Sequence, residues 1–283
     1  MPQSCSPLRY PGGKAKLYPY VSPLIKEQFN NTPPIYAEAY AGGFGLGIKL
    51  LLNNDVNSVL INDLDPAIYS FWKCVTSGHL HNKFIQMIQD TPIDIQNWQL
   101  QKEIYLGGIK NGQLKLGFSV FYLNRCNRSG IILANPIGGI NQNGDYSMDC
   151  RFNKETLITL INRIYELRSK IKVTNFDAID FAKAVDAHQT NVFFNFDPPY
   201  VKAGPSLYTN NYEDDDHIAL SICVKKLRNK WIMTYDDNEL IRNNYKTELI
   251  RTYSLQYSLE KKRKDTELFI YDHRIINPLP IAF

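Results

Sequence analysis

A mostly apolar run, Val192 to Phe196, is followed directly by Asp197-Pro198-Pro199-Tyr200. The run predicts a buried strand, so the quartet is expected where a strand ends and a loop begins. In an open α/β sheet, ligands bind at that position. The rest of the chain should therefore build an α/β sheet around this strand.

The chemistry of the quartet suits an amine attached to an aromatic ring, such as the amine of adenine. Such a nitrogen is a poor nucleophile because its lone pair is delocalised into the ring. The Asp197 carboxylate could accept one N–H, and the Pro198 carbonyl could accept the other. Pro198 and Pro199 hold that carbonyl because each has a fixed φ. Tyr200 could stack on the base. The alternative is a rigid turn in which Tyr200 caps the core.

A second strand–turn–helix pattern lies nearer the N-terminus. Residues 35–40 predict a strand, 41–47 a glycine-rich turn and 48–52 a helix, and a strand at 59–62 ends at Asp63. Asp63 follows the glycines by about twenty positions, the spacing at which a carboxylate holds a ribose hydroxyl. The glycines do not spell G-x-G-x-x-G. A dinucleotide and S-adenosylmethionine both suit this pattern, and a purely structural turn is the alternative.

The α/β alternation stops between about His79 and Arg168 and then resumes. Strands are predicted at 171–176, ending at Asp177, and at 231–235, with a terminal hairpin of 248–257 and 267–272. Helices are predicted at 17–28, 178–185 and 214–227. Residues 1–78 and 169–283 are therefore expected to form an α/β domain. Residues 79–168 are expected to form an inserted, mostly helical domain whose middle is rich in loops.

Composition sets broad limits on the class of protein. A chain of 283 residues with 44% apolar residues suits one large domain or a domain with an insert. It contains no apolar run of about 18 residues and no apolar signal-peptide core. A cytoplasmic protein without a membrane partner is therefore expected. The five cysteines are scattered and lack C-x-x-C spacing, which favours reduced thiols. The net charge of +4 permits a polyanionic partner without requiring one.

Three carboxylates, Asp63, Asp177 and Asp197, are each expected at the carboxyl end of a strand. They suit a cationic, hydroxyl-rich cofactor beside a base. They could also bind a metal, but no histidine adjoins any of them in the sequence, so no metal site is predicted. Lys14 follows a glycine pair and could also meet a carboxylate.

Clustered amide and guanidinium side chains in the insert suit phosphates and base edges. The candidates for DNA contact are Asn124, Arg125, Asn127, Arg128, Ser129 and Arg151. The alternative is a polar loop that only packs. The basic run at 261–264 could also contact phosphate, although such runs are usually solvated faces.

In order and spacing, these motifs resemble the Dam-like (alpha-group) DNA adenine methyltransferases. The resemblance covers nearly the whole chain. It rests on residues 9–14, 38–43, 62–65, 124–125, 197–200 and the basic stretch before Glu267-Leu268. It implies a Rossmann-like methyltransferase fold, with a mixed sheet, helices on both faces and an inserted target-recognition domain.

The resemblance also implies roles for individual residues. Tyr10 and Lys14 would lie over the methionine part of S-adenosylmethionine, in the segment that includes Gly12 and Gly13. The segment from Glu38 through Tyr40 to Gly42 and Gly43 would wrap the cofactor. Asp63, followed by Leu64, would hold the ribose, and Asp177, rather than Asp180, would lie near the cofactor's adenine. One departure is Cys126-Asn127-Arg128-Ser129-Gly130, where the family often has an aromatic-Asn-Gly segment. That departure leaves base specificity open.

The expected activity is site-specific transfer of a methyl group to the N6 amine of an adenine flipped out of duplex DNA. In-line transfer needs position and electrostatics but no covalent enzyme intermediate. That expectation fits the absence of a Pro-Cys pair. The alternatives are an RNA amine methyltransferase, a non-catalytic DNA-binding relative, and a nicotinamide-dependent oxidoreductase. The expected partners are duplex DNA and a cognate restriction nuclease, with the protein acting as a monomer or weak dimer.

Overall fold

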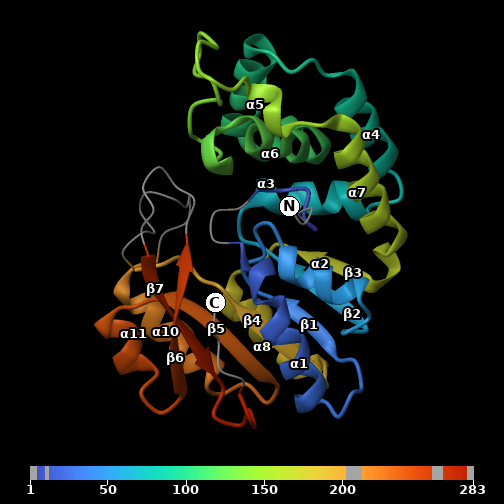
Figure 1. The fold of residues 1–283 in the computed structure, drawn as a ribbon. Coiled ribbons are helices and arrows are strands. Elements are labelled where there is room, and N and C mark those ends of the chain that lie inside the picture. The colour runs from blue at the N-terminus through green and yellow to red at the C-terminus, as the bar shows by residue number, and fades with distance from the viewer. Residues whose placement is uncertain (1–4, 10–12, 202–211, 257–263, 279–283) are drawn as a thin grey trace. The chain divides into compact units, whose positions relative to one another are not determined.

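A computed structural model describes residues 5–9, 13–201, 212–256 and 264–278 (Figure 1). The strands are β1 (Ile35–Glu38), β2 (Ser58–Asn62), β3 (Ile171–Thr174), β4 (Val192–Phe196), β5 (Lys230–Asp236), β6 (Leu249–Gln256) and β7 (Lys264–Tyr271). The α-helices are α1 (Tyr18–Gln28), α2 (Gly45–Leu52), α3 (Pro66–Thr76), α4 (His81–Asp90), α5 (Ile95–Gly107), α6 (Gln113–Cys126), α7 (Lys154–Glu166), α8 (Ala178–His188), α10 (Asp214–Val224) and α11 (Glu239–Asn244). Short 3-10 helices are η1 (Lys14–Leu17), η2 (Gly108–Asn111), η3 (Arg128–Gly130), η4 (Met148–Arg151) and η5 (Arg168–Lys170).

The chain divides into two compact units, residues 1–13 with 65–175, and residues 14–64 with 176–283. The first unit is mostly helical. Its core includes Phe71 of α3, which stacks on Phe121 of α6 with ring centroids 5.8 Å apart. Because α3 packs on α6, the unit begins at Asp65 rather than at His79. The expectation of a loop-rich middle is wrong for α6, whose apolar residues at helical spacing place Asn124 and Arg125 on a helix.

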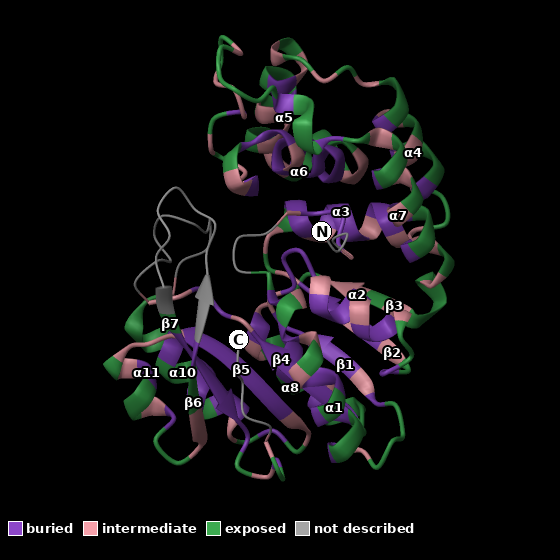
Figure 2. Ribbon diagram, in the orientation of Figure 1, coloured by how far each residue is buried: buried purple, intermediate pink, exposed green. Residues whose placement is uncertain are grey.

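The sheet contains seven strands in the order β3-β2-β1-β4-β5-β7-β6, and six of them belong to the second unit. Strand β1 runs parallel to β2 and β4, β4 runs parallel to β5, and β7 runs antiparallel to β5 and β6. This mixed sheet with a terminal antiparallel pair confirms the predicted fold class. Every residue of β4 is buried, as the apolar run predicts (Figure 2).

Helices cover both faces of the sheet in the second unit. Successive side chains of a strand point to opposite faces, and β4 follows that rule. Phe193 meets Phe29, which ends α1, with ring centroids 6.1 Å apart. Phe194 meets Phe181 of α8 at 6.5 Å. The face with α8 also carries α10 and α11, whose apolar residues join one buried cluster with β4 and β5.

The sheet topology gathers one set of side chains at one edge. Parallel β1, β2, β4 and β5 all end there, so the residues after them are neighbours. Antiparallel β7 begins at the same edge, and its Glu267 pairs in register with Asp236, the last residue of β5. The ligand-binding edge therefore receives side chains from early and late parts of the chain.

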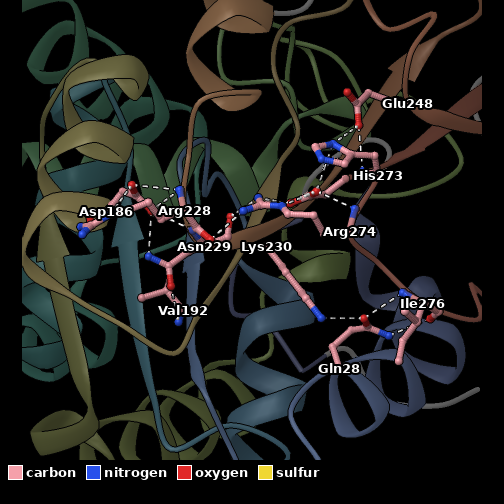
Figure 3. Close-up of polar contacts among 11 residues, drawn as sticks. Gln28, Asp186, Val192, Arg228, Asn229, Lys230, Glu248, His273, Arg274 and Ile276 are labelled. Atoms are coloured by element: carbon pink, nitrogen blue, oxygen red, sulfur yellow. Dashed lines mark hydrogen bonds and ion pairs between the residues drawn. The ribbon is translucent and has the colours of Figure 1, made fainter.

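A polar network ties the opposite edge of the second unit, where β4 and β5 begin (Figure 3). The buried Asp186 carboxylate accepts hydrogen bonds from the backbone N–H groups of Arg228 and Asn229, at 3.0 and 2.9 Å. The Asn229 side chain accepts a bond from the Val192 backbone at 3.0 Å. This network aligns the two strands whose far ends carry Asp197 and Asp236. None of the helices among the described residues is long and apolar enough to cross a membrane.

Candidate active site

The Asp197 carboxylate is held through one of its two oxygens. Its Oδ1 accepts a hydrogen bond from the Thr234 hydroxyl at 2.6 Å and lies 3.1 Å from the Lys14 ammonium. Thr234 is fully buried in β5, beside the end of β4, which explains its reach. No described residue bonds Oδ2, and the side chain is 27% exposed. The second oxygen, Oδ2, is therefore available to accept a hydrogen bond from an N–H or O–H group of a ligand.

Lys14 links Asp197 to the last residue of the quartet. Its Nζ donates a hydrogen bond to the Tyr200 hydroxyl at 2.8 Å and lies 3.8 Å from the Glu267 carboxylate. The side chain is only 7% exposed. The prediction that Lys14 meets a carboxylate is confirmed. A nearly buried ammonium needs such anionic partners because burial without them is costly.

The two prolines form a short, buried connection. Pro198 and Pro199 are buried, and the Val201 N–H closes the loop by donating to Asp236 at 3.0 Å. No described residue donates a hydrogen bond to the Pro198 carbonyl. The Tyr200 ring is half-buried and lies 6.5 Å from the Tyr235 ring, so Tyr200 touches the core as well as the site.

The glycine-rich turn after β1 is fixed by the end of β2. The Gly42 N–H donates to Asp63 Oδ2 at 2.8 Å, and Gly42 has a φ of 44°, which favours glycine. Asn62 is fully buried and bonds the Ala39 carbonyl and both backbone groups of Phe176, each at 3.0 Å. This residue thus joins β1 and β2 to the segment before α8. Gly43, like Gly42, is buried in the turn.

Glu38, the last residue of β1, is a buried acid. The Tyr36 hydroxyl donates to its Oε1 at 2.6 Å, and the Asn195 amide lies 3.3 Å from the same oxygen. Burial raises the pKa of Glu38 to about 8, and the negative charge of Asp197 adds to the rise against the two hydrogen bonds. Close by in the chain, the Tyr40 hydroxyl lies 2.6 Å from the Tyr212 hydroxyl.

Two exposed apolar side chains of the second unit follow strands, Leu64 after β2 and Phe176 after β3. Leu64 is 44% exposed and Phe176 is 55% exposed. Asp177 caps α8 by accepting from the N–H groups of Ile179 and Asp180. The sequence prediction included Leu64 and Asp177 but missed Phe176, although an aromatic residue beside a predicted cofactor carboxylate was a signal for it.

Two of the predicted DNA contacts in the first unit have structural partners. Asn124 is fully buried and bonds the backbone N–H and carbonyl of Arg9 and the carbonyl of Gly130. Asn127 is fully buried and accepts from the Trp98 indole at 2.6 Å. These hydrogen bonds occupy the side-chain amides of both residues. The contacts therefore indicate that Asn124 and Asn127 stabilise the following turn from inside the first unit.

Three arginines gather beside that turn. Arg125 donates to the Arg151 carbonyl at 2.7 Å, and Arg9 donates to the Asn127 carbonyl at 3.2 Å. Burial lowers the pKa of Arg125 to about 10, and the positive charges of Arg9 and Arg151 add to that shift. Arg128 and Arg151 are exposed, and Ser129 is half-exposed with a φ of 55°. Like charges placed this close favour an anion.

Other predicted residues lie elsewhere. Tyr10, Gly12 and the basic residues 261–263 are outside the described part of the chain, and Gly13 is exposed. Among the described residues, one group could offer three metal ligands, Glu248, Asp272 and His273. This group lies near the start of β5, because the Asp272 N–H donates to the Trp231 carbonyl. The Arg274 guanidinium forms an ion pair with the Asp272 carboxylate (Figure 3). That guanidinium leaves the group poorly suited to a cation.

Comparison with known proteins adds an independent finding. A family model described as D12 class N6 adenine-specific DNA methyltransferase matches residues 10–259. Type II methyltransferase M1.LlaDCHI of Lactococcus lactis subsp. cremoris is 25% identical over an alignment 287 residues long, which covers 94% of this chain and 94% of that protein. Modification methylase StsI of Streptococcus sanguinis is 25% identical over an alignment 221 residues long, which covers 74% of this chain and 30% of that protein.

Proposed function

Because this chain belongs to the D12 class N6 adenine-specific DNA methyltransferase family, we propose that the Asp197 site transfers a methyl group from S-adenosylmethionine to an adenine flipped out of duplex DNA. The family match covers most of the chain, and the activity of this protein is adenine-specific DNA methylation. The residues of the site, the cofactor and the flipped state of the base are the parts proposed here.

The observation that carries the proposal is the one-sided fixation of Asp197. Thr234 and Lys14 both contact Oδ1, which leaves Oδ2 of this partly exposed side chain as a hydrogen-bond acceptor. One N–H of the adenine amine donates to Oδ2 and the other donates to the Pro198 carbonyl. Both bonds draw the nitrogen towards tetrahedral geometry and localise its lone pair. The two acceptors are preorganised because the buried prolines and the Val201–Asp236 bond fix the loop.

Tyr200 holds the base by stacking. Its hydroxyl accepts from Lys14, so the ring is oriented before the base arrives. Base–aromatic stacking is worth about 1–3 kcal/mol and is compatible with a base taken out of the duplex.

The cofactor is assigned to the edge formed by the ends of β1 and β2. S-adenosylmethionine supplies an electrophilic methyl group on a cationic sulfur. The bond between Gly42 and Asp63 fixes a turn whose backbone a ligand can approach closely, and Leu64 and Phe176 offer apolar faces for an adenine ring. Asp177 adds an acidic group beside this turn, as a cationic ligand requires, and Glu38 ends the preceding strand as a carboxyl group whose pKa burial raises to about 8. From the sequence resemblance, Tyr10 and Gly12 are also proposed to contact the cofactor.

The first unit is proposed as the target-recognition domain. The cluster of Arg9, Arg125 and Arg151 suits DNA phosphates, with Arg128 and Ser129 on the exposed turn as candidates for base contact. Asn124 and Asn127 shape that turn from inside. The relatives are named as a type II methyltransferase and a modification methylase, which supports a restriction-modification setting with a cognate nuclease. A monomer or weak dimer in the cytoplasm is the proposed state.

Labelled methyl incorporation tests the proposal against its alternatives. Incubation with labelled S-adenosylmethionine should label duplex DNA, not structured RNA, and digestion should release N6-methyladenine. Calorimetry should detect S-adenosylmethionine binding by the full chain without DNA. Label in RNA alone would favour the RNA alternative. Absence of both label and cofactor binding would favour a non-catalytic DNA-binding relative.

A further inference from the structure

Lys14 contacts two acids of the second unit, the partly exposed Asp197 and the buried Glu267. Asp197 and Tyr200 are the residues proposed to touch the base, and Lys14 bonds both. Small movements of this ammonium would therefore change both at once.

Glu267 has no direct place in the proposed reaction, yet it is almost completely buried. Its side chain is 1% exposed, and it receives a short hydrogen bond from the Tyr253 hydroxyl. Burial raises the pKa of Glu267, and the positive charge of Lys14 opposes that rise. An acid is buried at this depth at a cost unless a partner compensates for it.

The strand register explains why Glu267 reaches Lys14. Glu267 lies opposite Asp236 on one side and opposite Tyr253 on the other, in the middle of an antiparallel ladder. The Glu267 backbone is fixed by hydrogen bonding to both neighbouring strands, so the position of its carboxylate is well defined. Lys14 comes from the short η1 helix and has a long side chain with many rotamers.

From these contacts we propose that Glu267 is a positioning residue, whose buried carboxylate holds the Lys14 ammonium where it bonds Asp197 Oδ1 and the Tyr200 hydroxyl. Glu267 then acts on Asp197 only through Lys14, and its own hydrogen bond with Tyr200 helps to hold the second of the two residues. This inference rests on the proposed role of Asp197 as the amine acceptor.

The first test is Glu267→Gln, which keeps the size of the side chain and removes its charge. We expect kcat to fall by ~10²-fold because the catalytic pair is misplaced. The KM for duplex DNA and the dissociation constant for S-adenosylmethionine should stay within about twofold. The loss of an interaction made only in the transition state lowers kcat and kcat/KM equally and leaves KM unchanged. Glu267→Asp keeps the charge and should recover part of the lost kcat.

A double-mutant cycle with Lys14→Met separates positioning from a general structural role. The cycle is run in a Tyr200→Phe background, which removes the hydroxyl that contacts Glu267 directly. If Glu267 acts on Asp197 through Lys14, adding Glu267→Gln to Lys14→Met in that background should cause no further fall in kcat. Asp186→Asn is the matched control, because Asp186 is another buried, hydrogen-bonded acid of the second unit at the opposite edge (Figure 3). It should lower the free energy of unfolding and leave kcat near that of the wild type.

Additive losses of kcat in the cycle, or a kcat of Glu267→Gln equal to that of Asp186→Asn, would overturn the proposal. Should Glu267→Gln fail to fold, Tyr253→Phe disturbs the same carboxylate by removing one hydroxyl, and its loss of kcat should also vanish in the Lys14→Met background. Full activity of Asp197→Ala would instead refute the proposed function itself, so the two failures are distinguishable.

Discussion

The buried acid Glu38 makes a quantitative prediction about stability and pH. In the unfolded chain its carboxyl group ionises near its ordinary pKa of 4.5, whereas in the folded protein burial raises that pKa to about 8. Between these pH values the folded state holds a proton that the unfolded state has lost. The free energy of unfolding therefore falls as pH rises from 4.5 to 8 and is independent of this group above that range.

The size of the effect follows from the shift. At 1.36 kcal/mol per pKa unit, the whole range corresponds to about 5 kcal/mol, of which about 2 kcal/mol falls between pH 6 and pH 8. Glu38→Gln removes the titration. The glutamine also gains a partner, because the buried Asn195 Oδ1 has no hydrogen bond within the described chain and could accept from the new amide. The variant should therefore fold at both pH values.

Urea unfolding of the wild type and Glu38→Gln, followed by circular dichroism at pH 6 and pH 8, tests this reasoning. The stability of Glu38→Gln relative to the wild type should increase by about 2 kcal/mol from pH 6 to pH 8. An equal pH dependence in the two proteins would refute the assignment of a proton to folded Glu38.

Three further substitutions test particular contacts. Asn62→Ala removes three hydrogen bonds at the ends of β1 and β2 and should lower the free energy of unfolding, measured by thermal unfolding, by about 3 kcal/mol. A decrease below about 1 kcal/mol would show that Asn62 does not link these segments. Asn127→Ala removes the Trp98 bond and should speed limited proteolysis within 128–147, whereas unchanged cleavage would contradict its role in shaping the turn. Tyr200→Ala should lose about 1–3 kcal/mol of base stacking, measured as weaker binding to DNA with a mismatched target base, and Tyr200→Phe should keep most of it; equal losses would argue against stacking.

The fold could be predicted from the sequence because its central strands carry strong local signals. The run at 192–196 is apolar except for Asn195 and becomes fully buried β4, and the pattern at 35–62 gives β1, the glycine turn and β2. The boundary at His79 could not be placed correctly because α3 looks like a helix of either unit. Only its aromatic packing on α6 decides the division.

The site was predictable where residues adjoin strand ends and was missed where distant segments meet. Asp63 and Asp197 follow strands directly, so their shared edge was visible in the sequence. Thr234 and Glu267 lie inside strands, and they reach the site only through the strand order and the antiparallel register of β7. For Asn124 and Asn127, local composition does not reveal that their amides bond within the chain.

The central claim is that Asp197 accepts an N–H of the target amine. Asp197→Asn keeps the shape of the side chain and removes the charge, and Asp215→Asn, on the exposed first turn of α10, is its control. Transfer of labelled methyl to duplex DNA in a single turnover, together with calorimetry of S-adenosylmethionine binding, measures both steps. We predict that Asp197→Asn loses at least ~10²–10³-fold in transfer rate while binding the cofactor normally, and that the control is unaffected. Transfer by Asp197→Asn at the rate of the control would contradict the account.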